Sequence, residues 1–185
     1  MPFDQGSPQF GLNDAKIATW TSTGVYSAPV DVMSIQMGSV AMELTSAILT
    51  GDDRQTAISS AAIGGTVQMR WGGLNLDALA VLIGKAVTTV TQVDQMQITG
   101  GHKMPYVGIV LKALSAEAGD TWLFLPKCKI MSGFTLAQME YGAFTIPEVT
   151  MQIVDDETYG AINIITHPTD VPITVIPPAD IAEIP

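Results

Sequence analysis

The feature that most constrains this chain is a two-residue alternation of apolar and polar side chains, which recurs along much of its length. In residues 66–71, for example, Val67, Met69 and Trp71 alternate with polar residues. Successive side chains of a strand point to opposite faces, so this pattern predicts strands with one buried face. The same reasoning predicts strands at 96–98, 105–114, 121–131, 134–141, 148–154 and 161–165.

A long β-hairpin is expected in the first half of the chain. Apolar residues recur at close to a two-residue spacing from Val25 to Leu49, and the turn signal Gly51-Asp52-Asp53 follows them. The return strand ends at Trp71. We therefore expect two long strands that pair on either side of the turn.

One short helix is predicted at residues 76–83. Asn75 is a candidate N-cap, Asp77 places an anion in the first turn, and Gly84 is a candidate for the left-handed residue after the helix. A helix this short gains its stability by packing on a sheet. The predicted fold is mainly β, a β-sandwich with one short flanking α-helix and a long β-hairpin loop.

The 185 residues fit a single domain with distinctive ends. Residues 1–24 mix Gly, Ser, Thr, Asn and Pro with few apolar positions, which predicts an N-terminal arm that orders only against neighbours. Residues 168–185 hold five prolines, Pro168, Pro172, Pro177, Pro178 and Pro185. Proline favours extended backbone without ladder hydrogen bonds, so this segment is expected to form a strap or a loose tail.

The charge balance argues against nucleic-acid binding. Asp and Glu number 18 against 8 Lys and Arg, which gives a formal charge of -10. Binding phosphates requires clustered cations, and this chain has few. Charged residues make up only 14% of the chain, against roughly 25% in soluble domains, so much of the surface is expected to be neutral or covered by partners.

The sequence indicates neither export nor membrane insertion. Its start lacks the basic and apolar parts of a secretory signal, and its longest apolar runs, such as 78–83, are too short to span a bilayer. Cys128 is the only cysteine, so no intramolecular disulfide can form. Assembly in the cytoplasm fits these features.

No catalytic motif is present, and no metal or cofactor is expected. His102 and His167 are the only imidazoles, and their turn-like surroundings favour solvated loop histidines over a general base. Cys128 lies between two lysines, yet a buried strand cysteine is the simpler interpretation. The acidic turns at 52–53 and 155–157 lack the oxygen spacing of a calcium loop. We therefore expect a protein without enzymatic activity.

The order of several segments resembles the tail tube proteins of long-tailed, non-contractile bacteriophages (siphophages). In the first half these segments are Met42-Glu43-Leu44-Thr45, Thr50-Gly51-Asp52-Asp53, Gly65-Thr66-Val67-Gln68, and Leu74-Asn75-Leu76-Asp77-Ala78-Leu79 before Gly84. In the second half they are Pro105-Tyr106-Val107-Gly108-Ile109-Val110-Leu111-Lys112-Ala113, Leu125-Pro126-Lys127-Cys128-Lys129-Ile130 and Glu140-Tyr141-Gly142-Ala143-Phe144-Thr145-Ile146-Pro147-Glu148-Val149-Thr150. None of these segments is a catalytic signature.

The resemblance implies a structural virion protein that self-assembles. Six copies would form a ring in which the inner sheets join into one barrel, and the rings would stack into a hollow tube. A loop at residues 45–64 would reach the next ring, whereas the alternative is an ordinary surface hairpin. The contact residues implied for that loop are Ile48, Leu49, Asp52, Asp53, Arg54, Ile58 and Ile63.

Phage DNA would then pass through the lumen without specific binding. An acidic lumen would repel DNA, and we place Asp94, Asp155, Asp156 and Glu157 there as a hypothesis. Implied partners are the tape measure, terminator and distal tail proteins. Two alternatives stay open: another ring-forming tail protein, such as a terminator or baseplate protein, and a β-sandwich binding module. The latter needs exposed aromatic platforms, whereas Trp71 and Trp122 are expected to face the core.

Overall fold

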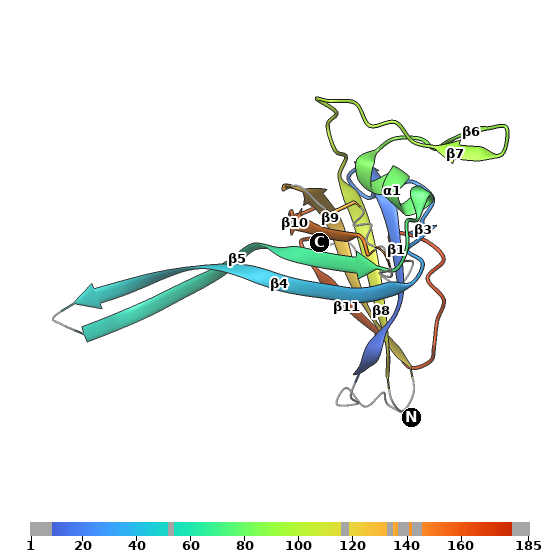
Figure 1. The fold of residues 1–185 in the computed structure, drawn as a ribbon. Helices are drawn as coiled ribbons and strands as arrows, with labels where there is room; N and C mark the ends of the chain where they lie inside the picture. Colours follow the sequence, from blue (N-terminus) through green and yellow to red (C-terminus); the bar gives the residue numbers. More distant parts are fainter. Residues whose placement is uncertain are drawn as a thin grey trace.

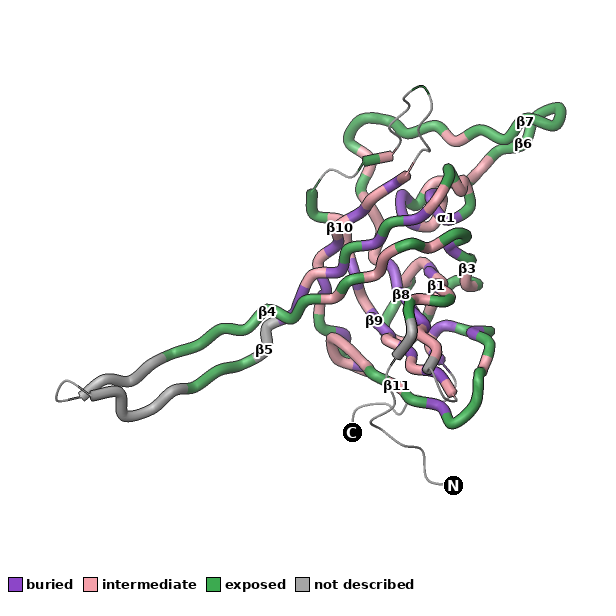
Figure 2. Tube along the Cα trace, turned by 60° about the horizontal axis from the view of Figure 1, so that its bottom comes forward, coloured by how far each residue is buried: buried purple, intermediate pink, exposed green. Residues whose placement is uncertain are grey.

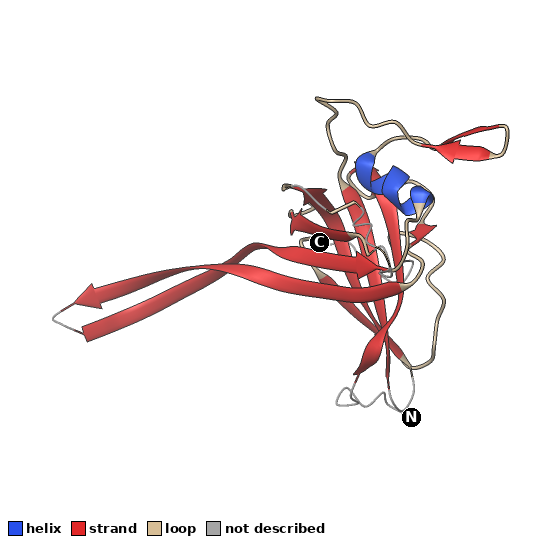
Figure 3. Ribbon diagram, viewed as in Figure 1, coloured by secondary structure: helices blue, strands red, loops and turns tan. Residues whose placement is uncertain are grey.

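In the computed structural model, the fold is described for residues 9–51, 54–115, 119–132, 135–136, 141 and 146–178. These residues form one helix and a set of antiparallel strands (Figures 1 and 3). The elements are β1 (Gln9–Ser22), β2 (Val25–Tyr26), β3 (Val30–Asp31), β4 (Ile35–Gly51), β5 (Arg54–Trp71), α1 (Leu76–Ile83), β6 (Thr88–Val90), β7 (Val93–Gln95), β8 (Val107–Ser115), β9 (Asp120–Ile130), β10 (Glu148–Ile153) and β11 (Asn163–His167).

Nine of these strands form one continuous sheet, and β6 and β7 pair separately as a small hairpin. The main sheet follows the order β2-β1-β8-β9-β10-β5-β4, with β3 on β1 and β11 on β9. The sheet curls until its β4 end crosses over β1 and β8 (Figure 1). At this crossing, a Cβ on Gly38 of β4 would lie 2.9 Å from the side chain of Leu111 in β8. The two layers of the expected sandwich are therefore the two halves of one curled sheet, and the mainly β class with one short helix is confirmed.

The main core fills the inside of this curl. Val67, Met69 and Trp71 of β5 are all buried there, as their alternation predicted. Leu79 and Ile83 of α1 pack into the same cluster. Removing such side chains from water is the main favourable term in folding, so the curl is held closed by its own apolar lining.

The helix has the ends that the sequence predicted. The Asn75 side chain accepts hydrogen bonds from the backbone N–H groups of Asp77 and Ala78, and Gly84 adopts the left-handed conformation at φ 74° and ψ 35°. α1 packs on β1 and β3 at one end of the sheet (Figure 1).

The prediction of an irregular N-terminal segment at residues 1–24 is wrong for residues 9–22, which form β1. This strand lies inside the sheet and pairs with β8 from Gln9 opposite Ser115 to Thr19 opposite Val107. Ala15, Ile17 and Ala18 are fully buried. The strand needs few large apolar residues because partners on either side satisfy its backbone, and small side chains suffice where the layers approach closely. Residues 1–8 lie outside the described part of the chain.

The C-terminal segment forms a strap as far as residue 178. Ile173 and Ile176 are buried in a second apolar cluster, which they share with Trp122 and Phe124 on the outer face of the sheet. Residues 179–185 lie outside the described part. The expected strand at 96–98 is wrong, because the small hairpin β6–β7 ends just before it. Most of the expected strand at 134–141 also lies outside the described residues.

Candidate functional site

The most unusual feature of the molecule is the far half of the β4–β5 hairpin, here called the arm and defined as residues 43–64. The strand β10 accompanies β5 only from Arg70 to Gly65, and beyond that point β4 and β5 pair with each other alone. The arm projects well clear of the sheet (Figures 1 and 2). Nine residues at about 3.3 Å each give it a reach of roughly 30 Å.

The arm has no buried face over the side chains that the structure describes. Residues 43–47 and 59–61 are all exposed, with Leu44 at 65%. A strand packed on a core would alternate between buried and exposed side chains, as β10 does. A two-stranded ribbon of this kind is marginally stable in water by itself. The arm therefore has the character of a surface that is completed by a partner.

A bulge and two glycines mark the base of the arm. Ile63 is skipped in the ladder, because Glu43 faces Gly64 and Leu44 faces Ala62. Gly64 has a φ of 138°, and a Cβ on Gly65 would lie only 2.4 Å from the carbonyl oxygen of Ala41. An extra residue bends and twists a strand, and glycine permits the close backbone approach. These residues therefore direct the arm away from the body.

The arm is nearly uncharged along its length. Between residues 43 and 64 its charged residues are Glu43 at the base and Asp52, Asp53 and Arg54 at the turn. Edge strands usually carry charges that discourage pairing with other chains. Glu43 is tied to the body, since its carboxylate accepts a hydrogen bond of 3.1 Å from Gln152. The stretch between base and tip thus lacks the usual protection against association.

For the residues implied as contacts of the loop at 45–64, the structure describes the backbone of five and no side chain. The backbones of Ile48, Leu49, Arg54, Ile58 and Ile63 all belong to the arm, where they form a regular hairpin in place of an open loop. Their side chains lie outside the described part of the structure, as do Asp52 and Asp53 entirely. Their contact with another subunit stays a prediction.

The four acids placed in a lumen are not brought together. Asp94 is exposed on β7, where its carboxylate accepts a 2.5 Å hydrogen bond from the Thr89 hydroxyl. Asp155 and Glu157 are exposed in the turn after β10. The prediction that Asp156 faces a lumen is wrong, because its side chain is buried, with 1% of the residue exposed. Its carboxylate instead accepts hydrogen bonds from Trp20, Thr158 and Tyr159.

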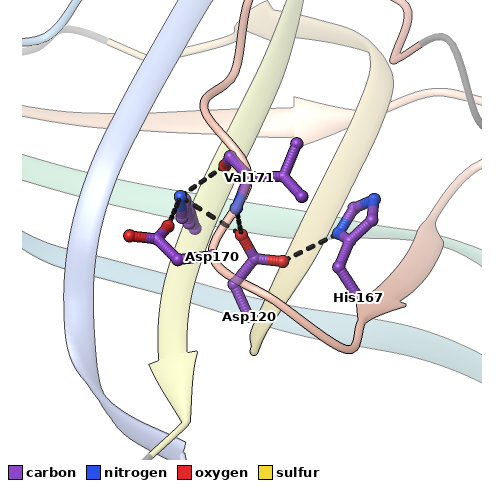
Figure 4. A network of polar contacts seen from close by, with 5 residues as sticks. Asp120, His167, Asp170 and Val171 are labelled. Carbon is purple, nitrogen blue, oxygen red and sulfur yellow. Dashed lines mark hydrogen bonds and ion pairs between the residues drawn. The ribbon is translucent and has the colours of Figure 1, made fainter. Parts of the chain in front are cut away.

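A buried polar network, which the sequence did not reveal, fastens the strap (Figure 4). Asp120, at the start of β9, is fully buried and accepts hydrogen bonds of 2.8 Å from both His167 Nδ1 and the Val171 backbone N–H. Lys112 of β8 lies 3.1 Å from the same carboxylate and also contacts Asp170 and the Val171 carbonyl. These residues come from two distant parts of the sequence, 112–120 and 167–171, so no local motif predicts the network.

The pKa values of the ion pair favour the charged forms of both partners. Burial opposes a charge on Asp120, but hydrogen bonds from the Val171 N–H and from Lys112 outweigh it and lower the pKa of the carboxyl. For Lys112, burial also opposes the charge, whereas contacts with Asp170 and Asp120 raise the pKa of the ammonium. The network is therefore a charged clamp between the sheet and the strap.

The two histidines and the cysteine that the sequence offered as candidate catalytic residues each pack against other parts of the fold. His167 is buried against Asp120, so the interpretation as a solvated loop histidine is wrong for it. His102 is partly buried, with Nε2 2.7 Å from the Ile83 carbonyl oxygen. Cys128 is fully buried, as expected, and burial raises the pKa of its thiol. In the described part of the chain, no group of three or more His, Cys, Asp or Glu side chains is placed to hold a metal ion.

Comparisons with known proteins were made at the level of family models, curated proteins and solved structures. No protein-family model matches the chain, and no curated protein matches it. Among solved structures, a chain of the 6-fold symmetrised baseplate of the anti-feeding prophage is similar at 11% identity and a TM-score of 0.45. The match covers 87% of this chain and 97% of that chain. At these values the likeness establishes neither a shared fold nor a shared function. Over the described residues, no helix has the length and apolarity needed to cross a membrane.

Proposed function

We propose that this chain is the tail tube subunit of a long-tailed, non-contractile bacteriophage, which assembles into rings of six that stack around a channel for DNA. The observation that carries the proposal is the arm, a projecting two-stranded ribbon whose described side chains are exposed on both faces. The described side chains of this ribbon, at residues 43–47 and 59–61, bury little apolar surface within the chain and so contribute little to the stability of a monomer. A neighbouring subunit supplies the missing surface.

The order of sequence segments that resembles siphophage tube proteins supports the same conclusion. Thr50 and Gly51, which open one segment of that resemblance, end β4 at the far end of the arm, and Gly65, which opens the next segment, lies in β5 at its base. In the proposed tube, the arm reaches from one ring to the next. Its neutral stretch stays soluble by hydrogen bonding to water and then packs against the neighbouring ring.

Ring closure accounts for the open edges of the curled sheet. β4 is a terminal strand of that sheet, so the hydrogen-bonding groups on its outer edge have no partner in the described sheet. A head-to-tail contact repeated around a closed ring removes such edges in every copy. Six copies at -10 each carry -60, and charge of that sign on the inner wall would repel DNA. Asp94, Asp155 and Glu157 remain candidates for the lumen.

Electron microscopy of the concentrated protein tests the proposal. Rings that stack into long hollow tubes are the expected result, and isolated rings would instead indicate a terminator or baseplate role. Particles that stay monomeric at every concentration, with and without a tail-tip extract, would overturn the proposal and favour the binding-module alternative.

A variant without the arm gives the matched control. Replacing residues 44–63 by Asn-Gly provides a two-residue turn between Glu43 and Gly64, which already face each other in the ladder. This variant should fold, because the body keeps its core, and it should not form tubes. Tube formation by the armless variant would contradict the role assigned to the arm.

A further inference from the structure

A second surface feature combines two lysines of β9 with the aromatic rings of Trp20 in β1 and Tyr106, the residue before β8. The Lys127 ammonium lies 4.4 Å from the ring centre of Trp20 and 5.1 Å from that of Tyr106. The Lys129 ammonium lies 4.6 Å from the ring centre of Tyr106. We call these four residues the lysine platform. Contacts at these distances are cation–π interactions, which orient both ammonium groups.

The platform is held firmly in place. The Trp20 backbone N–H donates a 2.9 Å hydrogen bond to the Tyr106 carbonyl, and the two rings meet edge to face at 5.7 Å. The Trp20 indole N–H donates to the buried Asp156 carboxylate at 3.0 Å. On the β9 side, the Lys127 carbonyl accepts a hydrogen bond from the Val154 N–H. The two positive charges therefore project from a preorganised base.

These charges have no anionic partner within the described part of the chain. Neither ammonium lies within 4.0 Å of a carboxylate oxygen there, although the chain has 18 acidic residues. Arg70 and Lys112, by contrast, both have one. Lys127 and Lys129 are partly exposed, and the N–H groups that do not face the rings remain able to donate. The platform is thus a site of positive charge on an acidic protein.

We propose that the lysine platform binds the acidic tip of the arm of a second copy, through Asp52 and Asp53. This inference rests on the proposed function, since it assigns the surface on which the arm docks. Asp52 and Asp53 are consecutive acidic residues next to Arg54, in a segment that is otherwise uncharged from 44 to 64, and their charge is opposite to that of the two ammonium groups on the platform. DNA is a poorer match, because phosphate binding requires a larger cluster of cations than two lysines on a chain of charge -10.

Zero-length carbodiimide crosslinking tests the contact directly, because it joins an ammonium and a carboxylate only where they touch. Unlabelled and ¹⁵N-labelled full-length chains are mixed, concentrated and crosslinked, and the peptides are identified by mass spectrometry. The expected product joins Lys127 or Lys129 of one copy to Asp52 or Asp53 of the other, with mixed isotopes. Crosslinks from these lysines only to other carboxylates, or none at all, would overturn the proposal.

Crosslinking together with electron microscopy distinguishes a failure of the docking site from a failure of the proposed tube function. Tubes without the lysine-to-tip crosslink would retain the proposed function and refute the docking site. The crosslink in a sample that forms only small oligomers would support the docking site and refute the tube.

A charge exchange provides the second test. Lys127→Glu with Lys129→Glu should raise the concentration needed for assembly by about tenfold or more, since like charges would face each other. Adding Asp52→Lys and Asp53→Lys to the same chain should restore assembly. Lys103→Glu, at an exposed lysine outside the four platform residues, is the matched control and should have little effect. Thermal unfolding checks that each variant folds, and Lys127→Gln serves as a milder replacement.

A failure of the exchanged tip to restore assembly in folded protein would count against the docking site. Fluorescence anisotropy with a labelled DNA duplex covers the other class of ligand. DNA binding by the wild type that disappears in the double-glutamate variant, without any lysine-to-tip crosslink, would assign the platform to nucleic acid and overturn the proposal.

Discussion

The body and the arm are built from the same two strands, yet they differ in what surrounds them. In the body, β5 alternates between buried Val67, Met69 and Trp71 and more exposed residues, because β10 pairs with one edge and the core lies beneath. In the arm, every described side chain from Glu43 to Ala47 is exposed, although the ladder between β4 and β5 continues. Whether a side chain of this hairpin is buried therefore depends on the elements that pack beside the hairpin, and not on the pairing between β4 and β5.

This difference implies that stability and assembly are separate properties of the two regions. The body holds the apolar area and the buried ion pair that stabilise the monomer. The arm holds exposed apolar side chains, such as Met42 at its base and Leu44 beyond it, which contribute little until a partner covers them. Substitutions in the body should change unfolding, whereas substitutions in the arm should change association.

The largest effect is expected for Trp71→Ala in the body. Trp71 is fully buried at the end of β5, so its removal leaves a large cavity under the curl. We expect the free energy of unfolding to fall by about 4 kcal/mol. Urea denaturation of the monomer measures it, and a loss below about 1 kcal/mol would mean that the curl does not depend on this core.

Asp120→Asn should lower the free energy of unfolding by about 3 kcal/mol, because it leaves the buried Lys112 ammonium with the exposed Asp170 as its remaining carboxylate partner. The strap should loosen at the same time. Limited proteolysis near residues 168–170 measures the loosening, with Glu157→Gln, an exposed acid, as the control.

The contribution of this ion pair should depend on pH in a defined way. Folding lowers the pKa of Asp120, so its contribution is complete above the ordinary carboxyl pKa of about 3.9 and is lost as pH falls through the lower folded value. Folding raises the pKa of Lys112, so that contribution is complete below about 10.4 and is lost as pH rises through the higher folded value. Lys112 and Asp120 therefore add no pH dependence between these limits to the difference between wild type and Asp120→Asn. Urea denaturation across pH measures it in a His167→Asn background, which removes the imidazole that also contacts Asp120. A steep change near neutral pH in that background would argue against the clamp.

Gly65→Ala tests the junction between the two regions. A Cβ at this position meets the backbone carbonyl of Ala41 at 2.4 Å, so β4 and β5 must separate. We expect a loss of about 2 kcal/mol in the free energy of unfolding, together with impaired assembly because the arm leaves the body at a different angle. Gly100→Ala, where a Cβ has open space, is the control. Unchanged stability and assembly would show that the base of the arm tolerates the displacement.

The smallest effect on the monomer is expected for Leu44→Ala. Leu44 is 65% exposed on the arm, so unfolding should change by less than about 0.5 kcal/mol. Assembly should weaken measurably in light scattering, because the proposed interface loses an apolar contact. An equal effect of Leu44→Ala and Trp71→Ala on unfolding would erase the distinction between arm and body.

The sequence predicted the parts of the fold that rest on local pattern. The alternation in β5 and β10 and the caps of α1 at Asn75 and Gly84 were all readable along the chain. The strand β1 was missed, because its small and polar residues gain their order from pairing with β8, almost a hundred positions away. The clamp around Asp120 was missed for the same reason.

The candidate site was predictable in position but not in form. The turn signal at 51–53 predicted the hairpin, and the resemblance to tube proteins placed the contact loop at 45–64. The bulge at Ile63 and the two glycines at the base of the arm appear only in three dimensions. The lysine platform likewise joins Trp20 of β1 to Lys127 of β9, although β8 lies between these strands in the sheet. Among the proposed lumen acids, the burial of Asp156 depends on its bond to the Trp20 indole, which no local spacing reveals.

Amide hydrogen exchange in the free monomer and in the assembled protein tests the central claim most directly. The arm should exchange quickly in the monomer, as a ribbon without a buried face, and at least about a hundredfold more slowly after assembly, while β8 and β9 stay protected in both states. Slow exchange across the arm in the free monomer, or exchange that does not change on assembly, would contradict the account.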